Sequence, residues 1–264
     1  MSFSGPFAIA AALTLGLSTG AQAAGAATKP SMPAGPPAVA THDDVASRID
    51  ALASSADALP RDRRASLVRR LSALGPAATD ALLTRAAADS PAMAALRSRD
   101  ASAARAFDAA ILETLGQRRD PRALPLFKRV FESSADSRVS QAAADGLGRL
   151  CEAGGFATLA SAARTSGRHA SNAWTALGLC RTEASATLLA GRLDSASDSD
   201  DVRTLADALG SLGSTWAWQA MGEATRPEGA RVRQVASAAL HSALARVEGS
   251  TATTVREALR MVGE

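Results

Sequence analysis

The two cysteines, Cys151 and Cys180, are the residues of this chain whose chemistry is most specific. Each follows the leucine of a Leu-Gly pair by three or four residues. In stacked repeats, equivalent positions lie about 8–10 Å apart, and the one-residue offset could bring the two Cα atoms within the roughly 7 Å that a disulfide needs. In an exported protein we expect either a Cys151–Cys180 disulfide or two buried free thiols, and no catalytic role for either.

The remaining residues do not form a recognisable metal site or catalytic site. His42, His169 and His241 are isolated from one another in different repeats, so they cannot supply a paired set of metal ligands. An acidic run lacks the alternating carboxylates, glycine turn and closing glutamate of a calcium loop, and we expect it to be a solvated loop that ends in a helix cap. Its members are Asp194, Asp198, Asp200 and Asp201. With no nucleophile–base pair, phosphate loop or carboxylate dyad in the sequence, we expect no enzyme activity and no metal or other cofactor.

Two tryptophans indicate a contact surface. Trp216 and Trp218 open a predicted helix two residues apart, so their side chains point roughly 200° apart. One should lie in the core, whereas an exposed partner would be typical of an interface anchor. The second helices of helical repeats line an inner surface, and we therefore predict a protein-binding site that combines Trp216 or Trp218 with Arg164 and Arg192.

A recurring Leu-Gly pair indicates the elements that position these residues. It occurs at Leu74, Leu115, Leu147, Leu177 and Leu209, and a sixth copy at Leu240 has histidine in place of glycine. A period near 30 residues is typical of a stacked array of helix pairs. We expect each leucine to pack the stack and each glycine to end its helix in a left-handed conformation.

The helices expected from apolar spacing and caps form pairs after a lead-in helix over 42–57, which Thr41 and Asp44 should begin with a capping box. The expected pairs are 67–74 with 77–88, 107–115 with 121–131, 139–150 with 156–163, 170–179 with 184–193, 202–212 with 216–224, and 232–244 with 251–262. Ser90-Pro91 and Asp120-Pro121 read as helix starts, and Ser250 reads as the cap of the last helix.

Composition agrees with an all-α protein. Hydrophobic residues make up 47% of the chain but aromatic residues only 3%, so alanine, leucine and valine dominate. The net charge of +3 is small and is not gathered in one block, which argues against nucleic-acid binding. The densest basic cluster, which we expect to be a solvated helix face, consists of Arg61, Arg63, Arg64, Arg69 and Arg70.

The N-terminus indicates export. An apolar run from Phe7 to Leu17 precedes Ala21-Gln22-Ala23, which fits a small-x-small cleavage site, although no basic residue precedes the run. We predict a signal peptide at 1–23, a disordered linker at 24–40 and a repeat domain at 41–264. The run is too short to span a bilayer, so we expect a periplasmic or secreted protein without an integral membrane span. A disordered leader on a cytosolic protein is the alternative.

The repeats resemble HEAT-like repeats of the phycobilin-lyase type. Val202-Arg203, Ala206, Leu209-Gly210 and Leu212-Gly213 match the first half of that pattern, and Asp120-Pro121 with Ala123-Leu124 matches its turn and second helix. The resemblance, over about residues 61–262, implies a right-handed α-solenoid of about six helix pairs. This family contains scaffolds, binding modules, lyase subunits and a metal-dependent hydroxylase. The His-Glu dipeptides of the hydroxylase are missing here.

These observations favour a non-catalytic, protein-binding scaffold of the cell envelope, whose partner the sequence does not identify. The alternative is a lyase-like or other accessory subunit that gains activity only within a complex. A chromophore or metal retained on purification would favour the accessory subunit.

Overall fold

The computed structural model describes residues 41–59, 63–88, 90–220 and 227–263, and every regular element within them is helical. The proposed signal peptide (1–23), the linker (24–40) and Arg61 lie outside the described residues. The first helix, α1 (His42–Ser54), begins with the expected capping box, in which Thr41 and Asp44 each bond the other's main-chain N–H. This helix packs against later helices and covers one end of the array.

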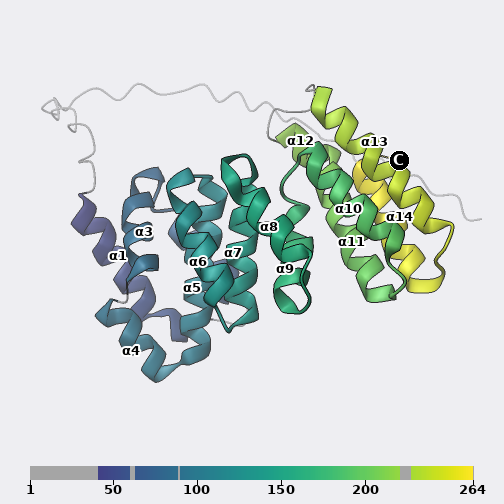
Figure 1. Cartoon of the computed structure of the whole chain (residues 1–264). Coiled ribbons are helices and arrows are strands. Elements are labelled where there is room, and N and C mark those ends of the chain that lie inside the picture. Colours follow the sequence, from purple (N-terminus) through teal and green to yellow (C-terminus); the bar gives the residue numbers. More distant parts are fainter. Residues whose placement is uncertain (1–40, 60–62, 89, 221–226, 264) are drawn as a thin grey trace, which may run out of the picture. The chain divides into compact units, whose positions relative to one another are not determined.

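Two layers of helices build the domain (Figure 1). In the first layer each helix packs against the next one along the array. These helices are α2 (Arg63–Ser72), α5 (Ala101–Arg118), α7 (Ser137–Arg149), α9 (Arg168–Leu177), α11 (Ser199–Gly213) and α14 (Gly249–Val262). The second layer alternates with it along the chain and consists of α3 (Thr79–Ala87), α6 (Leu124–Ser133), α8 (Phe156–Ala163), α10 (Glu183–Ser195) and α13 (Pro227–Leu244).

Short elements connect the layers. A helix not paired in the predicted scheme, α4 (Pro91–Arg99), packs against α1 and α5. Three 3₁₀ turns and one π-helical turn complete the described elements together with α12 (Thr215–Ala220). The 3₁₀ turns are η1 (Ala56–Ala58), η2 (Pro76–Ala78) and η3 (Pro121–Ala123), and the π-helical turn is η4 (Cys151–Gly155). The architecture confirms an all-α helical repeat.

The last predicted pair is present, because α13 and α14 pack against each other, but its two helices lie in the opposite layers from those expected. We expected 232–244 to open the sixth pair and 251–262 to close it. Instead α13 packs against α10 in the second layer, and α14 takes the next first-layer position against α11. A Cβ atom on Gly210 would lie 2.9 Å from the Cα atom of Ala258, which shows how closely α14 approaches. Ala258-Leu259, rather than Ala239-Leu240, therefore continues the Leu-Gly series.

The glycines of the Leu-Gly pairs also have a different role from the one we expected. Of the five, only Gly75 has a positive φ, of 77°. Gly148 lies within a helix, and a Cβ atom there would lie 2.3 Å from the carbonyl oxygen of Ala176 on the next first-layer helix. At Gly178 the corresponding distance to the oxygen of Ala208 would be 2.7 Å. These glycines allow neighbouring helices to approach closely. Gly148 does not end its helix, and Gly178, which is the C-cap of α9, has a right-handed rather than a left-handed conformation.

Most of the expected caps are present. Ser90 accepts a hydrogen bond from the N–H of Met93 at the start of α4, and the carboxylate of Asp120 accepts one from Arg122 at η3. Asp198 caps α11 in the same way, but the acidic run is not the loop that we expected, because Asp194 lies in α10 and Asp200 and Asp201 lie in the first turn of α11. Ser250 does not cap α14, because that helix already begins at Gly249.

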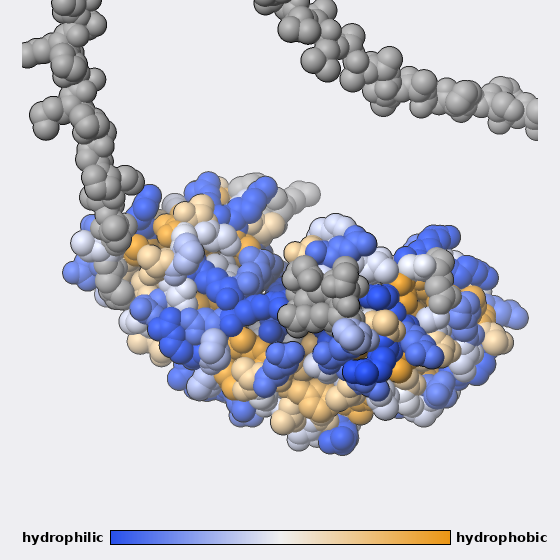
Figure 2. Space-filling view, turned by 90° about the horizontal axis from the view of Figure 1, so that it is seen from above, coloured by the Kyte–Doolittle hydropathy of each residue, from blue (hydrophilic) through white to orange (hydrophobic). Residues whose placement is uncertain are grey.

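Alanine and leucine dominate the interior, which runs continuously from Val45 to Val262. On the face shown in Figure 2, hydrophilic residues interleave with hydrophobic patches. Trp216 and Met261 are the large hydrophobic side chains that stay exposed within the described ranges. None of the helices in those ranges is both long and apolar enough to cross a bilayer.

Candidate functional site

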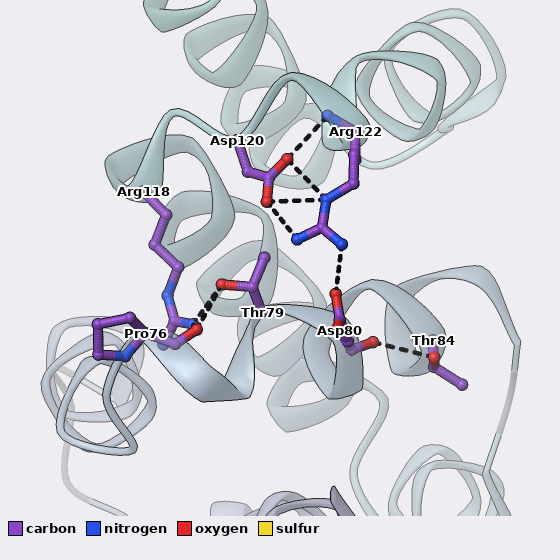
Figure 3. Close-up of polar contacts among 7 residues, drawn as sticks. All are labelled: Pro76, Thr79, Asp80, Thr84, Arg118, Asp120 and Arg122. Atoms are coloured by element: carbon purple, nitrogen blue, oxygen red, sulfur yellow. Dashed lines mark hydrogen bonds and ion pairs between the residues drawn. The ribbon is translucent and has the colours of Figure 1, made fainter.

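Two of the cavities on the domain stand out by the polar side chains around them. The first is the junction between the N-terminal repeats (Figure 3). Arg118, at the end of α5, donates to the hydroxyl of Thr79 at 2.9 Å and to the carbonyl of Pro76 at 3.2 Å. Arg122 bridges Asp120 and Asp80, each at 2.6 Å. Because these donors meet acceptors of the chain itself, the junction is best explained as a clamp between repeats.

The second place is a groove between α8 and α10, with α9 and α11 as its floor. The two second-layer helices make almost no contact with each other here, whereas α10 packs directly against α13. The groove encloses about 800 Å³, a volume within the usual range of ligand clefts. It is the candidate site, which we call the α8–α10 groove.

Two arginines supply its positive charge. Arg164 forms the C-cap of α8, and its side chain is exposed. Arg192, on α10, pairs with Asp201 of α11 at 2.6 Å and keeps 40% of its side chain exposed. Two guanidinium groups thus face one carboxylate in the lining, and within the part of the chain that the structure describes no acidic side chain pairs with Arg164.

The remaining lining is apolar or hydroxylated. Trp174 on α9 is half-buried, as is Leu188 on α10. Thr187 is exposed on α10, and its hydroxyl bonds the carbonyl of Glu183 in the preceding turn. Gly191 completes the wall without any side chain. The aromatic ring and the guanidinium groups are of the kinds that contribute most of the binding energy at protein interfaces.

The predicted contact residues separate into two locations. Arg164 and Arg192 lie together in the groove, but neither Trp216 nor Trp218 lines it. Trp218 is only 2% exposed and donates from Nε1 to the carbonyl of Leu212 at 2.9 Å, whereas Trp216 is 76% exposed on the short helix α12. The structure therefore does not bring the predicted tryptophans into the same groove as the two arginines. Trp174 provides the aromatic surface of the groove instead. In the sequence, only its position three residues before Leu177 indicated that it lies on a helix of the repeat.

Cys151 and Cys180 are joined in a disulfide, with their Cα atoms 5.1 Å apart. Cys151 opens the turn after α7, and Cys180 lies in the turn between α9 and α10. Both residues are buried. The bond therefore ties the end of α7 to the segment that leads into α10, one wall of the groove.

The other candidate residues are engaged in packing or pairing. The ring of His169 contacts Phe131 edge to face, with the ring centroids 5.3 Å apart. His241 is exposed on α13. In the basic cluster, Arg63 pairs with Asp100 at 3.0 Å and Arg64 with Glu113 at 2.7 Å, so these two side chains do not form a simple solvated face. Across the described ranges, no three His, Cys, Asp or Glu side chains gather as a metal site would require.

The carboxyl of Asp145, in the first layer, has a shifted pKa. Burial raises the pKa of Asp145 on α7, and this effect outweighs the hydrogen bond of 2.7 Å that Gln141 donates to it and the nearby charges of Arg149 and Arg64. Asp145 is remote in sequence from every residue of the groove lining. We assign it to the packing of α7 and not to the candidate site.

Comparison with known proteins identifies no family for this chain. No family model matches the chain, and no curated protein matches it. Among solved structures, the crystal structure of an engineered protein is 16% identical, with a TM-score of 0.42, and the alignment covers 84% of this chain and 89% of the other. The packing of its own helices therefore defines the chain as an all-α helical repeat protein.

Proposed function

We propose that this protein is a non-catalytic, protein-binding scaffold of the cell envelope, built from HEAT-like repeats, and that its partner binds in the α8–α10 groove. The observation that carries this proposal is the groove itself. It combines about 800 Å³ of open volume with a half-buried tryptophan and an arginine, Arg164, that pairs with no acidic side chain among the described residues. Buried aromatic and arginine side chains are the commonest energetic centres of protein interfaces.

The location in the envelope rests on two further observations. The apolar run and the Ala21-Gln22-Ala23 site have the form of a signal peptide. The Cys151–Cys180 disulfide suits an oxidising compartment, in which such bonds persist. Each supports export by a separate physical argument.

Site-specific photo-crosslinking in the native cell tests this proposal. A photoreactive amino acid replaces Thr187 in the groove or, as a matched control, Thr253 on α14. Both threonines are exposed, and both bond the carbonyl four residues earlier in their helix. We expect one envelope protein to be captured from position 187 and not from position 253. Identical capture from both positions, or none from position 187, would contradict the proposal.

A further inference from the structure

Gly191 is an anomaly among the glycines of this domain. A glycine within a helix costs about 1 kcal/mol relative to alanine, and it therefore needs a structural reason. At Gly148 and Gly178 the reason is the backbone of the next helix. Gly191 has neither a positive φ nor any heavy atom within 4 Å of where its Cβ would stand. Among the described glycines, it alone combines a helical conformation with open space.

The place of Gly191 suggests why a side chain is missing. It lines the α8–α10 groove next to Arg192, so any side chain there would take up groove volume. A bare helix surface lets another main chain approach more closely than a surface that carries Cβ atoms. Packing within the domain does not require this glycine, but passage of a ligand backbone would.

The charges of the groove indicate what that ligand carries. Arg192 is already paired with Asp201, while Arg164 is exposed and has no carboxylate among the described residues. Guanidinium groups bind carboxylates through charge-assisted, often paired hydrogen bonds. An acidic group on the ligand would therefore complement the lining. Trp174, half-buried on the floor, would pack against an apolar side chain of the same ligand.

We propose that the α8–α10 groove binds an extended peptide segment, with its carboxylate paired to Arg164, its main chain crossing Gly191 and an apolar side chain against Trp174. This inference rests on the proposed protein-binding function and specifies the chemistry of the partner. The occupant is an acidic, extended segment of another protein.

Panning a random dodecapeptide library on the complete, oxidised chain tests the inference. We expect enriched peptides to share an aspartate or glutamate close to an apolar residue. Their affinity should fall about tenfold or more for Arg164→Gln, since a charge-assisted hydrogen bond is lost, and by a similar factor for Gly191→Leu, which fills the groove. Gly191→Ala is the matched control, because it adds one methyl group, and it should change affinity less than threefold.

The folding of each variant is checked by the midpoint of its thermal unfolding. Because Gly191 faces open space, substitutions there should leave this midpoint unchanged or raise it. Enriched peptides without a carboxylate, or affinities that do not change for Arg164→Gln and Gly191→Leu, would overturn the inference and leave protein binding at another surface intact. If no peptide is enriched, the inference also fails. Crosslinking from position 187 then decides separately whether the proposed function stands.

Discussion

Replacing Gly148 by alanine tests whether the Leu-Gly glycines serve the close approach of neighbouring helices. The added Cβ would lie 2.3 Å from the carbonyl oxygen of Ala176, well inside van der Waals contact. Because the obstacle is backbone, α7 and α9 must move apart. Overpacking of this kind costs about 1–3 kcal/mol, and we take the upper end. The higher helix propensity of alanine returns about 1 kcal/mol, so the net destabilisation should be about 2 kcal/mol.

Gly191→Ala provides the matched comparison for this prediction. Both glycines are helical, but Gly191 faces open space, so its replacement should stabilise by about 1 kcal/mol through helix propensity alone. For a domain of this size, 1 kcal/mol corresponds to about 2–4 °C in Tm. We therefore expect Gly148→Ala to lower Tm by about 4–8 °C and Gly191→Ala to raise it by about 2–4 °C. Thermal unfolding is measured by circular dichroism at the helix band. Equal shifts for the two variants would refute the close-approach explanation.

Three further changes follow from burial and cross-linking. Replacing both Cys151 and Cys180 by serine should cost about 3.5 kcal/mol by the chain-entropy relation for a loop of this length, measured by urea unfolding with the reduced wild type as control. Trp218→Ala should cost about 3–5 kcal/mol and Trp216→Ala less than about 0.5 kcal/mol, because the first is buried and the second exposed; similar losses would contradict this assignment. Burial raises the pKa of Asp145, so its contribution to stability is full below the pKa of an unfolded aspartate and is lost as the pH rises through the raised pKa. Asp145→Asn should therefore raise Tm at neutral pH and weaken the dependence of Tm on pH. If the variant kept the wild-type dependence of Tm on pH, burial of Asp145 would not be the cause of that dependence.

Local sequence patterns predicted the helices well because caps and apolar spacing act over a few residues. Thr41, Ser90 and Asp120 all begin the elements that they were expected to begin. The layer that each of the last two helices joins was not predictable from the same patterns. Val232-Arg233 and Ala239-Leu240 match the repeat, yet α13 occupies the second layer. Which layer a helix joins depends on long-range contacts that a local match does not contain.

The candidate site was predicted only in part for a similar reason. Arg164 and Arg192 were expected on the inner surface of the array, and they do meet in the groove. Trp216 and Trp218 attracted attention by their spacing, but the short helix α12 carries them outside the groove lining. Trp174 has no distinctive neighbours in the sequence. Its significance arises from the separation of α8 and α10, which only the three-dimensional arrangement reveals.

The central claim, that a partner occupies the α8–α10 groove, is tested most directly by amide hydrogen exchange of the chain, free and bound to the protein captured at Thr187. We expect exchange to slow upon binding in the segment 163–171 and around Gly191, which line the groove, while α14 remains unchanged. Slower exchange confined to α14 or to α12, with the groove segments unaffected, would contradict the claim.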